Sequence, residues 1–460
     1  MTVPYISHTD EMARDNRSVL AAILIVLFLA ATDGTVMGTL LPTIADKLGQ
    51  RDLYPWIMSG FLLPLALVAP ISGAMADRFG ASKVLVVGIL LFLLASVAAA
   101  LSPSLPWLIV ARVGQGAGAG IIIVLSYTVL AILYDPERRG RMQGVLSGVW
   151  GLAAIVGPLV GAGLNATLGW RWVYWINLPI GLLGLIILSR TRLVGNANTG
   201  TRIFPTAQAL FAVMVFGVLL FLSEFGRNAA YHIGPIAGAA ALLAFLMLYF
   251  DVRKAPGRSP VPVNFLLRRD LLAVAALILL ASAGLYASVT ILPFSLYEIH
   301  GWRPLSIGFF IMIAALGWVV GSATCGGVLK NYGYRRPTLL GALMLVAGAS
   351  GLALTIGCRT TVPVALSELL IGLGTGFVAT ATLVLSQNAA PPTYIGSYTS
   401  TVQLLRNLGA AFGVNALAAV QIYGGNGSGS FELSFAALAG LMTLGLLLAF
   451  LLPDKYHVRQ

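Results

Sequence analysis

Long apolar runs separated by short polar stretches recur along the whole chain. Each run is about 20 residues long, the length that a helix needs to cross the hydrocarbon core of a bilayer. We therefore predict an all-α polytopic membrane protein with fourteen transmembrane helices. The first run leads into TDGTVMGTLLP without a small-residue cleavage site, so we interpret it as a retained helix. The predicted helices are 18–41, 53–75, 83–102, 105–133, 142–166, 172–190, 204–224, 231–250, 271–296, 304–328, 337–357, 362–387, 395–421 and 433–452.

Composition agrees with this pattern and excludes a soluble protein. The chain is 58% hydrophobic and 10% charged, with a mean hydropathy of +0.90, which leaves too little polar surface to cover a soluble domain. The net charge of +12 comes from lysines and arginines that gather in alternate loops and in the tails. The positive-inside rule places these loops and both termini in the cytoplasm, so we expect a bacterial inner (plasma) membrane protein that binds no nucleic acid.

Residues suited to enzyme chemistry are missing from the predicted spans. None of the four histidines lies well inside a predicted span, and Cys325 and Cys358 fall near opposite ends of neighbouring helices. No carboxylate cluster occurs within the spans. We therefore expect neither an enzyme nor a bound metal or cofactor.

The chain also contains a weak internal repeat. GAMADRFGASK (73–83) matches GGVLKNYGYRR (326–336) in its glycines and final basic residue, and RVGQGAGAG (112–120) matches the glycine spacing of ELLIGLGTG (368–376). The matches keep the same order at an offset of roughly 250 residues, as expected of two related halves.

The repeat predicts how the chain is divided. The two helices between the halves have no counterpart, which indicates an inserted hairpin and a 6+2+6 arrangement. We predict an N-terminal six-helix bundle (1–190), an inserted two-helix hairpin with flanking cytoplasmic linkers (191–270) and a C-terminal six-helix bundle (271–460).

With these features, the whole chain resembles the fourteen-helix drug:proton antiporter branch of the major facilitator superfamily. TDGTVMGTLLP is similar to that branch's first-helix motif, and WRWVYWINLPIG is typical of drug exporters. The loop signature between helices 2 and 3 appears as Gly73, Asp77, Arg78, Gly80 and Lys83. The fourth-helix signature appears as RVGQGAGAG with Arg112, and the fifth-helix antiporter motif as GPLVGAG with Gly157, Pro158 and Gly161.

The resemblance implies a major facilitator fold that works by alternating access as a monomer. It implies that the loop signature acts as a conformational latch and that the fifth-helix motif helps to set export direction. The alternative interpretations are a solvated loop charge for Asp77 and simple helix packing for Gly157 and its neighbours.

Four charged residues lie well inside predicted spans: Asp33, Arg112, Glu368 and Arg406. Asp33 lies ~22 Å from the start of its helix, at a depth similar to that of Arg112 and Glu368. Burial disfavours the ionised form of a carboxyl group, and a nearby arginine favours it. A carboxyl group beside an arginine can therefore load and release a proton near neutral pH. We predict proton coupling by Asp33, Arg112 and Glu368. The alternative for Asp33 is a structural acid that is hydrogen-bonded to Thr35 or Thr39.

Candidate substrate contacts come from aromatic and charged residues near the predicted cavity: Trp56, Tyr127, Tyr286, Phe294, Glu298 and Arg406. Two roles remain open for Arg406, which either binds an anionic group of the substrate or neutralises Glu368. If all four intramembrane charges offset one another, neutral or singly cationic hydrophobic substrates are favoured.

These observations predict a proton-coupled antiporter that exports small hydrophobic or amphipathic compounds such as drugs and toxic metabolites. Its partners would be the small-molecule substrate, protons and the lipid bilayer. One alternative is a translocase of lipid or lipid-linked molecules, for which the inserted hairpin would be the place to look. A proton-coupled metabolite importer is a weaker alternative because the fifth-helix motif argues against it.

Overall fold

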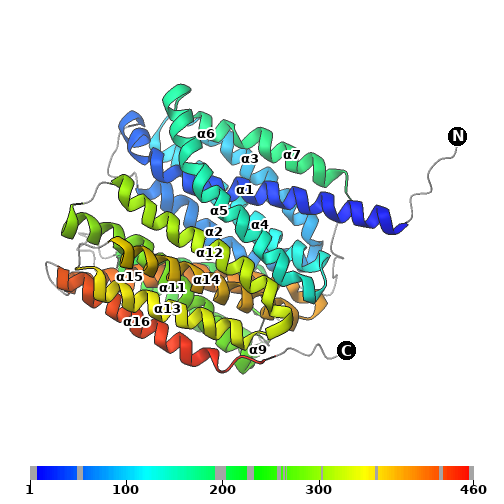
Figure 1. The fold of residues 1–460 in the computed structure, drawn as a ribbon. Helices are drawn as coiled ribbons and strands as arrows, with labels where there is room; N and C mark the ends of the chain where they lie inside the picture. Colours follow the sequence, from blue (N-terminus) through cyan, green and yellow to red (C-terminus); the bar gives the residue numbers. More distant parts are fainter. Residues whose placement is uncertain are drawn as a thin grey trace. The chain divides into compact units, whose positions relative to one another are not determined.

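The computed structural model (Figure 1) describes most of the chain as helix. The described residues are 8–48, 55–191, 204–224, 233–255, 259, 261–262, 265, 267–301, 304–357, 361–423 and 428–454. They form two compact units. Unit 1 comprises Met1–Asp135 and Leu152–Thr201, and unit 2 comprises Pro136–Gly151 and Arg202–Gln460.

Unit 1 is built from helices that pack pairwise, with α4 against α2 and α3, and α1 against α7. Its helices are α1 (His8–Leu48), α2 (Pro55–Phe79), α3 (Ala81–Ala100), α4 (Leu105–Leu133), α6 (Trp172–Trp175), α7 (Asn177–Ser189) and the second half of α5 (Pro136–Thr167). Pro136 opens α5 at a position where a missing N–H costs nothing. The short α6 is separated from α7 because Pro179 cannot donate a backbone hydrogen bond to Trp175.

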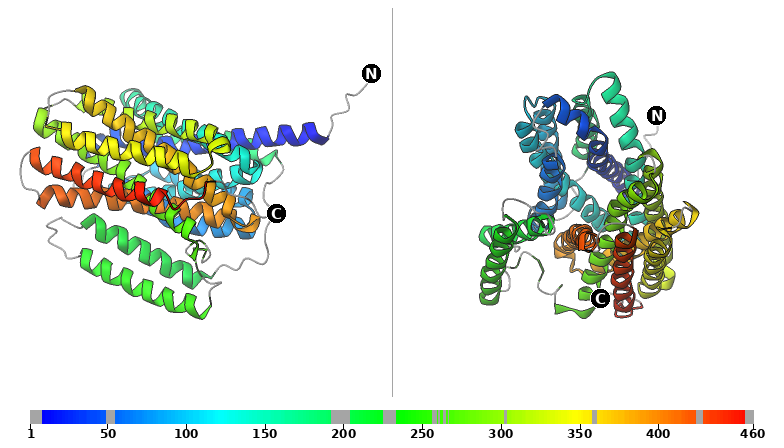
Figure 2. Two further views of the ribbon diagram at one scale, coloured as in Figure 1. Left: turned by 60° about the horizontal axis from the view of Figure 1, so that its bottom comes forward. Right: turned by 90° about the vertical axis from the view of Figure 1, so that its left-hand side faces the viewer.

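Unit 2 contains the first half of α5 and the remaining helices, in which α14 packs against α12 and α13, and α11 against α15. Its other elements are α8 (Pro205–Glu224), α9 (Ile233–Lys254), α11 (Arg269–His300), α12 (Pro304–Tyr332), α13 (Arg335–Thr355), α14 (Thr361–Ala389), a 3₁₀ turn (Pro392–Tyr394), α15 (Ile395–Tyr423) and α16 (Ser428–Ala449). Figure 2 shows α8 and α9 as an antiparallel pair, and α8 also contacts α15.

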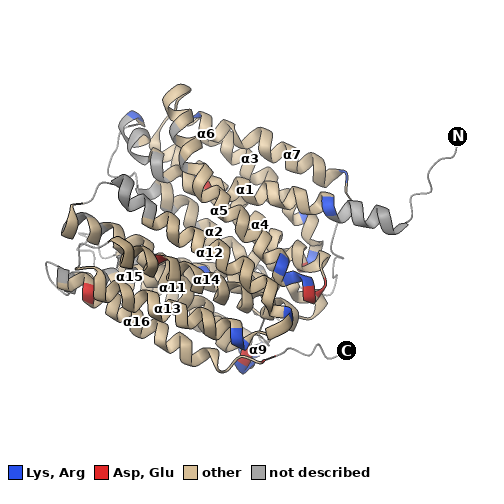
Figure 3. Cartoon of the chain, viewed as in Figure 1, with Lys and Arg blue, Asp and Glu red and all other residues tan. Residues whose placement is uncertain are grey.

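The prediction of an all-helical fold is confirmed, and each predicted range coincides with a helix or, for 172–190, with α6 and α7 together. Within the described residues, twelve helical stretches are long and apolar enough to cross a membrane. Helices α8 and α15 fall outside this set, so the count of fourteen spans stays a prediction. Charged residues lie mostly near helix ends, and the tan helix bodies carry little blue or red in Figure 3.

The geometry within each unit repeats as the sequence motifs do. A Cβ at Gly116 of α4 would lie 2.1 Å from the Phe61 carbonyl oxygen of α2, and one at Gly372 of α14 would lie 2.1 Å from the Ala314 carbonyl oxygen of α12. Only glycine permits so close an approach of two helix backbones. The matching glycines of both units therefore serve the same packing of corresponding helices.

The turns that follow α2 and α12 also correspond. Gly80 has a φ of 92° and Gly333 a φ of 69°, a left-handed conformation that other residues rarely adopt. Each glycine N–H donates to the carbonyl group four residues earlier, at Ala76 and at Leu329. Part of each loop signature is thus explained by the way its helix ends.

Candidate functional site

A buried ion pair joins α1 to α4 in unit 1. The Arg112 guanidinium contacts the Asp33 carboxylate through Nη1 and Oδ2, and both side chains are fully buried. Moving a lone charge from water into the interior of a membrane protein costs free energy, so each of these two charges is stabilised by the other. The pairing also neutralises the acid that interrupts the first apolar run.

The Arg112 side chain is positioned by α2 as well as by Asp33. Its Nε donates to the Ile57 carbonyl oxygen at 3.3 Å, and Nη1 donates to Gln115 Oε1 at 3.0 Å. The guanidinium carbon lies 4.2 Å from the centre of the Phe61 ring, a cation–π distance. Nη2 is buried without a hydrogen-bond acceptor among the described residues. Arg112 therefore has unused donor capacity at the ion pair.

Two amide side chains complete the environment of the carboxylate. Asn177 Nδ2 donates to Asp33 Oδ1 at 3.2 Å, and Gln115 Nε2 lies 3.4 Å from the same oxygen. Both amides also reach the Ser96 hydroxyl, at 3.3 Å and 2.9 Å. Ser96 in turn donates to the Phe92 carbonyl oxygen. Helices α1, α3, α4 and α7 thus converge on one carboxylate.

The residues Asn177 and Ser96 were not predicted as site residues. Asn177 could have been found from the sequence, because it is a lone amide within the apolar stretch WVYWINLPIG. Ser96 left no such signal, since a serine in an apolar helix can satisfy its hydroxyl within that helix.

The alternative interpretation of Asp33, a structural acid hydrogen-bonded to Thr35 or Thr39, is not supported by the contacts of Thr35. The Thr35 hydroxyl lies 3.0 Å from both the Thr32 and the Ala153 carbonyl oxygens, and no hydrogen bond to Asp33 is found. The side chain of Thr39 lies outside the described residues.

The fifth-helix motif contacts α1 at Thr35, two residues after Asp33. A Cβ at Gly157 would lie 2.0 Å from Thr35 Oγ1, whereas a Cβ at Gly163 would meet nothing within 4 Å. Gly161 is buried, and the side chain of Pro158 lies outside the described residues. Gly157 thus allows α5 to lie against the segment of α1 that carries Asp33.

This contrast gives a matched pair of variants in one motif. We expect Gly157→Ala to lower transport and thermal stability, because the added methyl group must displace Thr35 or the α1 backbone. We expect Gly163→Ala to behave as the wild type. Export rates and the unfolding temperature of the purified variants measure both effects. Equal behaviour of the two variants would contradict the assigned contact.

A second buried acid, Glu368 of α14, lies in unit 2. Its side chain is fully buried, and Ser288 Oγ of α11 lies 3.4 Å from Oε2. Among the described residues, Oε1 has no hydrogen-bond partner and no cation pairs with the carboxyl group. Glu368 takes the place of Arg112 in the repeat, but it does not reproduce the ion pair of unit 1. Among the described residues no ion pair joins Arg406 to Glu368, and both roles of Arg406 stay predictions.

The loop-signature residues differ in their environments. Asp77 and Gly73 are buried, Arg78 is partly buried with its guanidinium carbon 5.1 Å from the Phe79 ring centre, and Lys83 is exposed. Burial of Asp77 argues against a freely solvated loop charge, the bland interpretation of this residue.

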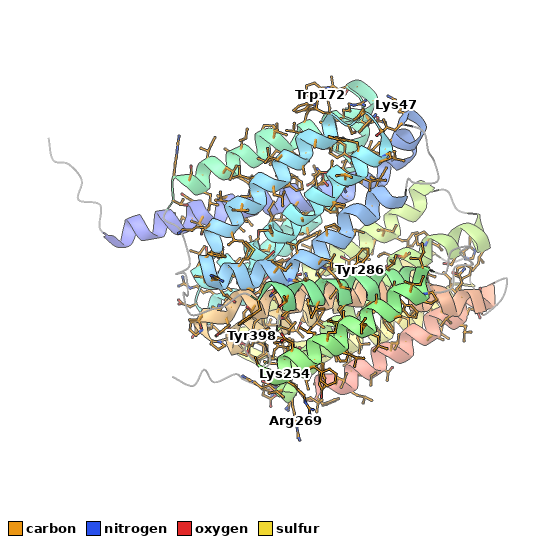
Figure 4. All side chains as sticks on the ribbon, turned by 180° about the vertical axis from the view of Figure 1, so that it is seen from behind. Lys47, Trp172, Lys254, Arg269, Tyr286 and Tyr398 are labelled. Atoms are coloured by element: carbon orange, nitrogen blue, oxygen red, sulfur yellow. The ribbon has the colours of Figure 1, made fainter. Side chains whose placement is uncertain are left out.

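The predicted substrate contacts are only partly described. Tyr127 of α4 is buried, Tyr286 of α11 is 39% exposed (Figure 4), and Arg406 of α15 is partly buried. The side chains of Trp56, Phe294 and Glu298 lie outside the described residues.

Comparison with known proteins decides the family. The model of the Major Facilitator Superfamily matches residues 23–414, which is most of the chain. The chain belongs to this superfamily. It is therefore a multi-pass membrane transporter of small molecules and not an enzyme.

Two curated relatives are named for multidrug transport. The multidrug transporter protein MdtP of Bacillus subtilis is 29% identical over 404 residues, with 87% of this chain and 74% of the relative covered. The multidrug efflux pump SdrM of Staphylococcus aureus is 26% identical, with 85% and 87% covered.

Solved structures agree on the fold. The crystal structure of the human organic anion transporter MFSD10 (TETRAN) superposes with a TM-score of 0.70 at 18% identity, covering 94% of this chain and 99% of that one. The proton:xylose symporter XylE gives a TM-score of 0.67 at 15% identity, covering 95% of both chains. These identities are low, so the likeness is one of fold alone.

Proposed function

We propose that this transporter is a proton-coupled antiporter that exports small hydrophobic or amphipathic compounds from the cytoplasm by alternating access. The observation that carries the proposal is the buried Asp33–Arg112 pair with its two amide donors. The names of two relatives, a multidrug transporter and a multidrug efflux pump, support the substrate class and the direction. The transporter would act as a monomer in the bacterial inner membrane with both termini in the cytoplasm.

Proton coupling follows from the charge balance at the pair. When Asp33 is ionised, Arg112 is neutralised. When Asp33 takes up a proton, Arg112 becomes an uncompensated buried charge, a situation that costs about 3–5 kcal/mol when one partner of a buried pair is removed. Protonation therefore favours a conformation in which Arg112 reaches water or another acceptor. Its free Nη2 donor is available for that contact.

The amides keep the carboxyl group in place in both protonation states. Asn177 and Gln115 donate to Oδ1, while Arg112 contacts Oδ2. A proton on Oδ2 would leave the two amide donors with their acceptor. The site can thus change its charge without losing its whole hydrogen-bond network.

Other parts of the prediction remain within this proposal. Glu368 is a second proton-binding candidate because it is buried and no cation of the described part of the chain pairs with it. We retain two six-helix bundles (1–190 and 271–460) with an inserted hairpin (191–270). The loop signature would act as the conformational latch. Asp77→Asn would therefore reduce the transport rate while substrate binding stays measurable.

Export by intact cells tests the proposal as a whole. Cells that produce the transporter should retain less of a fluorescent lipophilic compound than cells that lack it, and a protonophore should erase the difference because the driving proton gradient is gone. Export that persists unchanged with the protonophore would contradict proton coupling. Transfer of a labelled lipid between leaflets, without export of any soluble compound, would favour the lipid translocase instead.

A further inference from the structure

Arg406 has an unusual environment for a charge inside a membrane protein. It lies about 16 Å from the start of α15, near the middle of a ~30 Å hydrocarbon core. Among the described residues it makes no ion pair and no hydrogen bond. Within the described part of the chain, its guanidinium carbon lies 5.9 Å from the centre of the Trp318 ring of α12, a cation–π distance. A charged side chain at this depth normally faces a polar interior, so its partner should be something that enters the protein.

A second unused donor lies one helical turn earlier. The side chain of Gln403 is 4% exposed, and its buried Nε2 has no hydrogen-bond partner in the described structure. Residues three apart share a helix face, so Gln403 and Arg406 are neighbours on α15. An unsatisfied buried donor costs about 1–3 kcal/mol. Two adjacent donors without acceptors indicate a place where an acceptor group binds.

An aromatic surface lies beside these donors. Trp318 packs against Trp150 of α5, with ring centres 6.1 Å apart and planes tilted by 38°. Both indoles and Arg406 are partly exposed, so all three keep accessible surface. Indole rings bind flat aromatic compounds by stacking, and guanidinium groups bind carboxylates and sulfonates in a forked geometry.

From these contacts we propose that Arg406, Gln403, Trp318 and Trp150 form a binding site for aromatic anions, such as aryl carboxylates and sulfonates. The anionic group binds to the donors of α15, and the aromatic ring lies against the indoles. This inference rests on the proposed export function and narrows its substrate class. It differs from the neutral or singly cationic substrates expected from the sequence, because Arg406 makes no ion pair with Glu368 among the described residues.

Two probes with one aromatic framework separate this site from general export. Anilinonaphthalene sulfonate carries the anionic group, and phenylnaphthylamine lacks it. The amount of each probe taken up by energised everted vesicles is measured after filtration, for the wild type and for each variant. The folding of the variants is checked by size-exclusion chromatography. Arg190→Gln serves as the matched control because Arg190 is an exposed arginine at the end of α7.

We expect Arg406→Gln to lower transport of the sulfonate by about 10-fold or more, as loss of a charge-assisted hydrogen bond implies. Transport of phenylnaphthylamine should stay within about 2-fold, the spread expected of a contact worth under ~0.5 kcal/mol. Arg406→Lys should fall between the two because the charge remains without the fork. Gln403→Leu, which retains Arg406, should lower transport of the sulfonate alone, and Trp318→Leu should lower both probes.

Three results would overturn the proposal. In the first, Arg406→Gln transports the sulfonate as the wild type does. In the second, it loses both probes to the same extent. In the third, the wild type transports phenylnaphthylamine but no sulfonate, which leaves the export function standing. A wild type that transports neither probe would remove the export function as well.

Discussion

Replacing Asp33 with asparagine should abolish proton-driven export. Asparagine nearly keeps the volume of the side chain and can still accept hydrogen bonds from Asn177 and Gln115, but it cannot titrate. Exchange of substrate across the membrane without a pH gradient needs no net proton movement and should survive. Efflux from energised cells and substrate exchange in proteoliposomes measure the two activities separately.

The variant Asp33→Glu distinguishes a proton carrier from a structural acid. A carrier should keep partial activity with a shifted pH dependence, because the carboxyl group is still present but displaced by one methylene. A structural hydrogen-bonding role predicts the reverse order, with asparagine tolerated and glutamate worse on steric grounds. Full proton-driven export by Asp33→Asn would shift the carrier role to Glu368.

Removing the arginine should damage both stability and transport. Arg112→Gln leaves Asp33 as a buried acid without its cation, which costs about 3–5 kcal/mol if the acid stays ionised. The acid can avoid that cost only by holding its proton permanently. Either outcome prevents a cycle of proton uptake and release. We expect a lower unfolding temperature and loss of proton-driven export.

A double variant tests whether the two side chains act as a pair. In Asp33→Asn with Arg112→Gln no charge is left unpaired, so part of the lost stability should return while proton-driven export stays absent. A double variant whose destabilisation equals the sum of the two single variants would show that the side chains do not interact.

Much of the fold was predictable because the controlling patterns are local. Apolar length predicts a helix in a membrane, and matched glycines predict equivalent helix contacts in the two units. Gly116 and Gly372 bear this out, since each lies against a carbonyl oxygen of the corresponding neighbouring helix. The likeness in depth of Asp33 and Arg112 followed from helix rise alone.

Contacts that depend on the rotation of several helices were not predictable in the same way. Asn177 and Ser96 come from α7 and α3, and only the packing of these helices turns both toward Asp33. The sequence leaves two roles open for Arg406, and its contacts cannot be read from helix spacing. Glu368 lies on another helix without pairing with Arg406, which instead contacts Trp318.

Proton movement during substrate transport tests the central claim most directly. Proteoliposomes with a trapped pH-sensitive dye, no imposed pH gradient and an outward substrate gradient report protons carried in exchange. The account predicts that downhill substrate movement drives protons in the opposite direction in the wild type, and that Asp33→Asn moves substrate without moving protons. Equal proton movement in the variant and the wild type would contradict the assignment of Asp33 as the proton carrier.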